Sequence, residues 1–235
     1  MHRAVDRTNG YAIEAPTVTT VAVDGTDAVF PVARVYCVGR NYAEHAIEMG
    51  HDPDREPPFF FMKPADAVVP AGRLPFPTHT QELHHEIELV VALGDGGRDI
   101  PVEEALDHVY GYAVGLDMTR RDLQAAAKRA GRPWDMAKGF DQSAPTGTIR
   151  AAEEIGHPEH GAVSLLINGE QRQEGDLDQQ IWKVPETISY LSTLVTLRSG
   201  DLIMTGTPKG VGRVEPGDRL EGHIDGVGDV TVSYA

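Results

Sequence analysis

Residues 84–93 read HHEIELVVAL, and this stretch decides both the fold and the site. Side chains alternate between the two faces of a β-strand, so a strand over 86–93 places Glu86 and Glu88 on one face. Their Cα atoms are then about 6.5–7 Å apart, which lets both carboxylates reach one cation. An exposed strand end with two hydrated acids explains the same residues, and this stretch alone does not decide between the two interpretations.

A third acid, Asp117, favours the metal interpretation. It follows the apolar stretch 110–116, which we predict to be another strand, and strand ends often carry site residues. The alternative is an acid that simply favours the positive end of the next helix. Three carboxylates without clustered histidines or cysteines indicate a hard cation such as Mg²⁺, Mn²⁺ or Ca²⁺. Zinc is disfavoured, because the His-Glu-x-x-His pattern would need a histidine where Leu89 stands.

The rest of the chain reads as one β-rich domain with peripheral helices and without internal repeats. We predict strands at 34–38, 59–62 and 202–205, and hairpins that turn at Asn168-Gly169 and at Asp225-Gly226. Helices are expected at 42–49 with Asn41 as N-cap, at 119–130 with Thr119 as N-cap, and at 185–197. Residues 1–30 are expected to form an N-terminal arm, and residues 31–235 the folded domain.

The composition narrows the class of protein. The formal net charge is −15, from 36 acids against 21 lysines and arginines, and no basic stripe is present, which argues against nucleic-acid binding. No apolar stretch approaches the ~20 residues of a membrane span, and the first residues lack the apolar centre of a signal peptide. The single cysteine, Cys37, lies in an apolar run, so we expect a buried, inert thiol and a cytoplasmic protein.

Several polar side chains could serve such a site, each with a simpler alternative. His45 and Glu48 face the same way on a helix and could form a general base with its orienting acid, but spacing alone favours a surface pair. Lys138 could reach into a pocket or be a surface lysine. Arg121 and Gln124 share a helix face and could hold a carboxylate, or face solvent.

The glycine-rich loop 206–212 lacks the sequence of a nucleotide-binding loop. A tight loop that presents Thr207 and backbone N–H groups to a small anion remains open.

These motifs together resemble the fumarylacetoacetase-like hydrolase family, and the resemblance runs from about residue 32 to residue 234. It rests on six stretches in this order: VGRNYAEH (38–45), FMKP (61–64), HHEIE (84–88), GLDMT (115–119), AK (137–138) and TGTPKGVG (205–212). The resemblance implies a mixed β-sandwich roll, usually a homodimer, and an acylpyruvate substrate. Within the family, residues 48–61 look most like fumarylpyruvate hydrolases of the gentisate route.

The resemblance also assigns roles. It implies Glu86, Glu88 and Asp117 as ligands of Mg²⁺ or Mn²⁺, His45 and Glu48 as catalytic base and orienting acid, and Lys138 as oxyanion stabiliser. Its pocket residues correspond to Arg121, Gln124 and Thr207. The fourth metal-binding acid of the larger relatives has no match here.

Fumarylpyruvate carries a second carboxylate at its far end, and Arg40 or Lys63 could pair with it; otherwise both are structural surface charges. Oxaloacetate decarboxylation or tautomerisation, and isomerisation or decarboxylation in homoprotocatechuate breakdown, would use the same metal site. A non-catalytic dicarboxylate-binding dimer is the remaining alternative.

Overall fold

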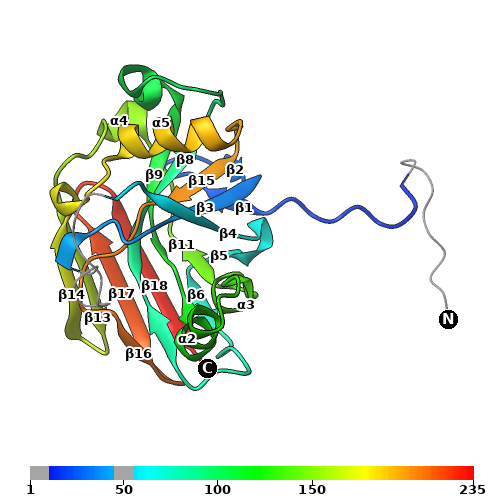
Figure 1. Cartoon of the computed structure of the whole chain (residues 1–235), viewed down its shortest axis with the longest axis vertical. Coiled ribbons are helices and arrows are strands. Elements are labelled where there is room, and N and C mark those ends of the chain that lie inside the picture. The colour runs from blue at the N-terminus through cyan, green and yellow to red at the C-terminus, as the bar shows by residue number, and fades with distance from the viewer. Residues whose placement is uncertain (1–10, 45–55) are drawn as a thin grey trace.

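The computed structural model describes residues 11–44 and 56–235 (Figure 1). Over these residues the chain is a β-rich roll with helices at its periphery, so the predicted fold class is confirmed. In this view the orange and red strands near the C-terminus lie in the lower part, while the longest helix of the described residues, α5 (Val184–Leu194), crosses the upper part.

The largest sheet within the described residues has eight strands and is centred on β8 (Ile87–Leu93) and β9 (Val109–Leu116). Its order is β4, β3, β15, β8, β9, β11 and β5, with β12 also paired to β9. β15 runs parallel to β3 and β11 runs parallel to β5, whereas the other neighbours are antiparallel. The remaining strands of this sheet are β3 (Arg34–Gly39), β4 (Phe59–Lys63), β5 (Val68–Pro70), β11 (Ala144–Thr146), β12 (Arg150–Ala151) and β15 (Asp201–Met204).

A second sheet of five strands, again counted over the described residues, has the order β14, β13, β17, β18 and β6. Its hairpins turn where the sequence predicts, and Asn168 and Gly169 both have the positive φ of a type I′ turn (54° and 83°). The bounds are β6 (Gly72–Leu74), β13 (Ala162–Ile167), β14 (Glu170–Asp176), β17 (Arg219–Ile224) and β18 (Gly228–Tyr234). Two small sheets complete the set: β1 (Thr20–Ala22) with β2 (Val29–Pro31), and β7 (Leu83–His85) between β10 (Thr119–Arg120) and β16 (Gly212–Val214).

Strand β8 is buried along its whole length, and its two faces belong to two different hydrophobic clusters. Ile87, Leu89 and Val91 face the cluster shared with the five-stranded sheet, whereas Val90 and Ala92 face the other cluster. The residue parity therefore places Glu86 and Glu88 on the same side as Val90. Both acids consequently enter a buried environment, as a metal site requires.

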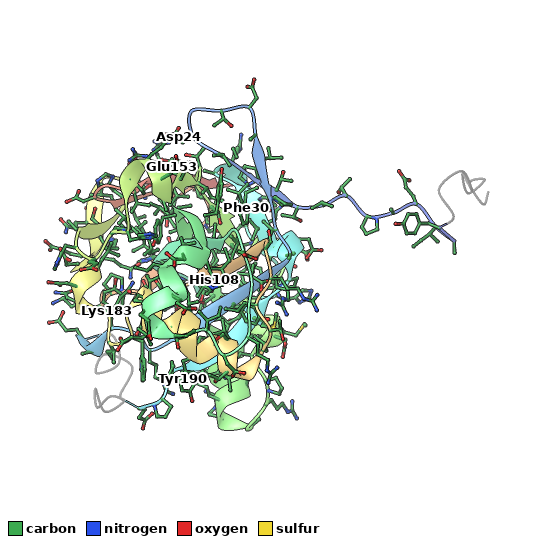
Figure 2. The ribbon with its side chains drawn as sticks, turned by 90° about the horizontal axis from the view of Figure 1, so that it is seen from above. Asp24, Phe30, His108, Glu153, Lys183 and Tyr190 are labelled. Atoms are coloured by element: carbon green, nitrogen blue, oxygen red, sulfur yellow. The ribbon has the colours of Figure 1, made fainter. Side chains whose placement is uncertain are left out.

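The helices lie at the edges of the sheets. Helix α5 packs against the 3₁₀ segment η3 (Val102–His108), and Figure 2 shows both from above with Lys183, Tyr190 and His108 labelled. The sequence pattern predicts that this helix reaches residue 197, but α5 ends at Leu194. Leu197 instead forms backbone hydrogen bonds with Gly97. The other helical segments are α2 (Arg121–Arg129), α3 (Asp135–Lys138), α4 (Ala152–Ile155), η2 (Ala65–Ala67) and η4 (Leu177–Gln179).

Thr119 does not cap helix α2, so that prediction is wrong. Thr119 lies in β10 opposite His84, and its hydroxyl donates to the carbonyl of Asp117 at 3.2 Å. The helix begins two residues later, at Arg121, whose N–H donates to the carbonyl of Glu82. Thr119 is therefore part of a strand, and the pairing of this strand with β7 excludes the helix-capping role that the sequence pattern predicted.

The β1–β2 hairpin, with Asp24 at its turn and Phe30 on its second strand in Figure 2, buries Val21, Val23 and Phe30 in the second hydrophobic cluster. Residues 11–19 continue from it as an extended segment that leaves the body of the molecule (Figure 1). The division into an arm over residues 1–30 and a domain over 31–235 stays a prediction. No helix of the described residues is long and apolar enough to cross a membrane.

Candidate active site

Glu86, Glu88 and Asp117 come together where β8 begins and β9 ends. Each offers a carboxylate oxygen, and these oxygens all lie within 4.8 Å of one another. All three residues are at least nine-tenths buried. The antiparallel register pairs Ile87 with Leu116, and the N–H of Asp117 donates to the carbonyl of Glu86 at 2.8 Å. The pairing of two apolar strands thus brings a distant acid beside the two same-face glutamates.

Three basic side chains surround these acids. Lys138 donates from Nζ to Glu86 Oε2 at 2.8 Å and to Asp117 Oδ2 at 2.7 Å. Arg121 forms an ion pair with Glu86 Oε1, and Lys63 Nζ lies 2.8 Å from Asp117 Oδ1. Burial alone would lower the pKa of Lys138, but the charges of Asp117 and Glu86 outweigh it and raise this pKa above its usual value. Lys138 is therefore a permanent cation near neutral pH.

Glu88 differs from the other two acids, because no basic side chain of the described residues forms an ion pair with it. Its Oε2 accepts a hydrogen bond from the N–H of Gly206 at 2.8 Å. Burial, together with the charges of Asp117 and Glu86, raises the pKa of Glu88 well above its usual range. A divalent cation would supply the missing countercharge, and a donor set of three carboxylates fits Mg²⁺, Mn²⁺ or Ca²⁺.

Lys63 is neither a surface charge nor a residue open to a substrate, so both sequence-based interpretations of it are wrong. Its side chain is fully buried, and its ammonium contacts Asp117 Oδ1 and the carbonyls of Met118 and Lys138. The ammonium donates hydrogen bonds to the two carbonyls, whereas its contact with Asp117 Oδ1 is an ion pair without hydrogen-bond geometry. Lys63 fixes Asp117 and the turn before Lys138, whereas Lys138 itself uses only two donors on the described residues.

Helix α2 supplies the next side chains. Arg121 and Gln124 face the pocket, as their spacing predicts, and Arg121 donates to Gln124 Oε1 at 2.7 Å. Lys128, one turn further on the same face, also lines the pocket. Lys128 was not predicted as a site residue, although the helical spacing of residues 121, 124 and 128 indicates a shared face.

The loop after β15 closes the pocket with Gly206 and Thr207. Thr207 is buried; its hydroxyl donates to the carbonyl of Ile87 at 2.7 Å and accepts from Gln173 Nε2 at 2.8 Å. Gln173, a buried side chain in the mostly exposed strand β14, also accepts from the N–H of Ile87 at 3.1 Å. No local pattern points to Gln173, because its role depends on Ile87, which lies 86 residues away in the sequence.

The pocket therefore contains or adjoins eight of the ten predicted site residues. Seven of them line it: Arg40, Glu86, Glu88, Arg121, Gln124, Lys138 and Thr207. Asp117 is fully buried against Lys63 and Lys138. The two remaining residues, His45 and Glu48, lie outside the described residues.

The chain on either side of residues 45–55 is held by one segment, residues 180–182. Tyr42 forms a β-bridge with Gln180, and the N–H of Trp182 donates to Asn41 Oδ1 at 2.7 Å. On the far side, the indole of Trp182 donates to the carbonyl of Glu56 at 3.0 Å. Asn41 also donates from its amide nitrogen to the carbonyls of Trp182 and Thr205. The helix predicted at 42–49, which Asn41 would cap, extends outside the described residues, so both stay predictions.

A β-roll in which three carboxylates converge beside its central strands can hold a divalent cation. Residues 34–233 match the family of the fumarylacetoacetate (FAA) hydrolase C-terminal region, and the chain belongs to this family.

Among solved structures, the chain is similar to fumarylpyruvate hydrolase from Pseudomonas aeruginosa in complex with Mn²⁺ and pyruvate, with 56% identity and a TM-score of 0.94 over 96% of this chain and 99% of that one. It is also similar to the mitochondrial oxaloacetate tautomerase of Mus musculus, with 46% identity over 82% of this chain and 87% of that protein. A third similar structure, 5-carboxymethyl-2-hydroxymuconate delta-isomerase from Mycobacterium smegmatis, has 30% identity and a TM-score of 0.78 over 88% of this chain and 78% of that one. Relatives that share this fold therefore differ in reaction.

Proposed function

We propose that this protein is a divalent-metal-dependent acylpyruvate hydrolase that cleaves fumarylpyruvate to fumarate and pyruvate. The buried cluster of three carboxylates with Lys138 and Arg121 carries the proposal, because it can hold both a cation and a 2-oxo acid. The similarity to a fumarylpyruvate hydrolase of Pseudomonas aeruginosa, whose complex holds Mn²⁺ and pyruvate, supports the choice of substrate and of Mg²⁺ or Mn²⁺.

The charges of the site suit a doubly negative substrate. Three carboxylates are balanced by Lys63, Lys138 and Arg121, so a divalent cation leaves two positive charges in a buried place. A dicarboxylate restores neutrality, and buried charge without a counter-ion is costly. Glu86, Glu88 and Asp117 would hold the metal, which supplies Lewis-acid polarisation of the substrate's 2-oxo group when bound.

The side chains around the cluster would then carry the reaction. Arg121 and Gln124, already joined by a hydrogen bond, orient the oxygens of the 2,4-dioxo head. Lys138 has one N–H donor beyond its two carboxylate partners, which it gives to the oxyanion formed at the 4-carbonyl. The C3–C4 bond then breaks, its electrons pass to C3 of the departing pyruvate enolate, and a proton converts this enolate to pyruvate.

His45 and Glu48 complete the proposal. We assign His45 as the base that takes a proton from the attacking water, and Glu48 as the acid that orients its ring. The oxygen of that water becomes part of the new carboxylate of fumarate. Tyr42 and Glu56, which precede and follow residues 45–55 in the sequence, both contact residues 180–182.

A second function deserves a direct comparison, because the mouse relative with 46% identity is an oxaloacetate tautomerase. Tautomerisation or decarboxylation of oxaloacetate needs the same cation site and the same enolate, but no attacking water. The isomerase of Mycobacterium smegmatis makes the homoprotocatechuate reactions a further alternative on the same site.

One assay panel separates these reactions. The purified protein is incubated with Mn²⁺ or Mg²⁺ and with fumarylpyruvate, maleylpyruvate, acetylpyruvate or oxaloacetate, and each is followed spectrophotometrically. We expect fumarylpyruvate to have the highest kcat/KM, with fumarate and pyruvate formed in equal amounts. Rapid turnover of oxaloacetate without cleavage of any acylpyruvate would overturn the proposal.

We further propose a cytoplasmic homodimer that acts in gentisate degradation. Met62 on β4 and Met136 on α3 are exposed apolar side chains that a second copy would cover. Light scattering after size-exclusion chromatography tests the oligomeric state directly.

A further inference from the structure

The pocket is also lined by two cations, Arg40 and Lys128, to which the proposed reaction at the carboxylate cluster assigns no role. Arg40 follows β3, and its guanidinium carbon lies 5.3 Å from the centre of the Phe59 ring. Lys128 is in the last turn of α2, and its ammonium lies 5.0 Å from the centre of the Trp134 ring. The two rings contact each other edge to face, with centroids 5.5 Å apart. Arg40, Phe59, Trp134 and Lys128 thus form one continuous wall, and all four line the pocket.

The backbone around Arg40 is shaped for this wall. Gly39 has no side chain, and a Cβ atom there would lie 2.0 Å from the Phe59 ring, so only glycine lets that ring pack on β3. Arg40 itself has a φ of +59°, in the left-handed region that non-glycine residues adopt at a cost. Both features put the guanidinium over the Phe59 ring and at the pocket.

Neither cation has an acidic partner: among the residues that the structure describes, no carboxylate lies within ion-pair distance of Arg40 or Lys128. Burial against the pocket wall and the nearby charges of Arg121 and Arg40 lower the pKa of Lys128. Cation–π contacts with the two rings account for the positions of the Arg40 and Lys128 side chains. They do not explain why two positive charges lie near each other without a carboxylate between them. A bound anion would relieve this repulsion.

The position of Lys128 fits the length of a dicarboxylate. Arg121, Gln124 and Lys128 lie on one face of α2, and a rise of 1.5 Å per residue puts the Cα of Lys128 about 6 Å beyond that of Gln124 and about 10 Å beyond that of Arg121. The two terminal carboxylates of an extended seven-carbon chain are roughly 7–8 Å apart, from C–C bonds of about 1.5 Å. A substrate whose head lies at Arg121 and Gln124 and whose chain runs along α2 is therefore long enough to reach Lys128 with its far carboxylate.

We infer that Arg40 and Lys128, carried by Phe59 and Trp134, form a distal anion subsite that selects acylpyruvates with a second carboxylate on the acyl tail. This inference rests on the proposed function for the position of the substrate's head. Lys63, which the sequence analysis considered for the second carboxylate, is buried against Asp117 and cannot serve this role. Lys128, which lines the pocket, takes its place beside Arg40.

The test compares substrates that share the dioxo head and differ in the tail. The kcat/KM values for fumarylpyruvate and acetylpyruvate are measured for the wild type, Lys128→Gln and Arg40→Asn, since asparagine tolerates a left-handed φ. Arg129→Gln, the exposed neighbour on α2, is the matched control. A charge-assisted hydrogen bond predicts a loss of roughly ten- to a hundredfold for fumarylpyruvate with Arg40→Asn, and roughly five- to tenfold with the more exposed Lys128→Gln. Acetylpyruvate should change less than about threefold in either variant, as should both substrates with the control.

A binding measurement separates failure of the subsite from failure of the proposed reaction. Calorimetry of the Mn²⁺-loaded protein compares fumarate with crotonate, which has the same carbon skeleton and one carboxylate. We expect fumarate to bind at least about tenfold more tightly, and Lys128→Gln with Arg40→Asn to abolish this difference. Equal affinity for the two acids in the wild type, or equal losses for both substrates in the variants, would overturn the subsite. Absence of any acylpyruvate cleavage by the wild type would instead overturn the proposed function, while the comparison of fumarate with crotonate would still report on Arg40 and Lys128.

Discussion

Replacing Lys63 with methionine tests whether buried charge balance holds the carboxylate cluster together. Methionine keeps an unbranched chain of similar length but removes the ammonium that contacts Asp117 Oδ1 and two backbone carbonyls. Removal of one partner of a buried ion pair lowers the free energy of unfolding by roughly 3–5 kcal/mol, because the remaining charge stays buried and poorly solvated. For a chain of this size each kcal/mol lowers the melting temperature by roughly 2–4 °C, so we expect a decrease of roughly 6–20 °C.

The assay is differential scanning calorimetry in EDTA and in excess Mn²⁺. Arg172→Met is the control, because it removes an exposed ion pair with Glu170 and should lower the melting temperature by less than about 2 °C. Mn²⁺ should raise the melting temperature of Lys63→Met more than that of the wild type, since the cation replaces the lost countercharge at Asp117. A variant that melts within about 2 °C of the wild type in EDTA would refute this account of Lys63.

Three further outcomes follow from the site and its surroundings. Glu88→Gln should weaken Mn²⁺ binding by more than the roughly 10–100-fold that loss of an outer partner costs, as titration calorimetry can measure. Glu82→Gln, a half-exposed acid that does not line the pocket, should leave binding unchanged. His45→Ala should abolish fumarylpyruvate cleavage but retain Mn²⁺ and oxalate binding, and hydrolysis near the wild-type rate would exclude His45 as the base. Hydrogen bonds to Asp229 and Asp225 raise the pKa of His223, so their stabilisation is present below its ordinary pKa and is lost as the pH rises through the raised value. His223 and its two aspartate partners are exposed, so at pH 5.5 His223→Gln should lower the melting temperature by at most about 2–4 °C. At pH 8.5 the same substitution should leave the melting temperature unchanged.

The parts of this fold that depend on local periodicity could be predicted from the sequence. Alternation along residues 86–93 placed Glu86 and Glu88 on one face, and the turn residues Asn168-Gly169 located a hairpin. Asp117 could be proposed as a third ligand because it ends an apolar strand, and the antiparallel pairing of β8 with β9 accounts for its approach to Glu86.

The parts that depend on contacts between distant segments could not be predicted in this way. Thr119 has the sequence of a helix cap but lies in a strand opposite His84, since pairing with β7 takes precedence over capping. Lys63 follows three phenylalanines and a methionine in a strand at the edge of the sheet, and nothing local indicates that it crosses to Asp117. Lys128 looks like any lysine of an exposed helix end until Trp134 and Arg40 are placed beside it.

The balance of charge leads to a last prediction, that cation and oxo acid bind cooperatively. Lys63, Lys138 and Arg121 carry as many formal charges as the three carboxylates, although their ion pairs are with Glu86 and Asp117 and not with Glu88. A divalent cation that enters therefore gives the site a net positive charge. An anionic oxo acid that binds alone gives the site a net negative charge. Each ligand therefore offsets the charge that the other adds, and the binding of one makes the binding of the other more favourable. Coupling between sites of this kind is typically 1–3 kcal/mol, or roughly 5–150-fold in affinity, and must be the same in both directions. Calorimetric titration of Mn²⁺ with and without pyruvate, and of pyruvate with and without Mn²⁺, measures the two factors independently once binding of Mn²⁺ to pyruvate in solution is subtracted. Factors below about twofold in both titrations would show that the three cations do not set the affinity of the site for its metal.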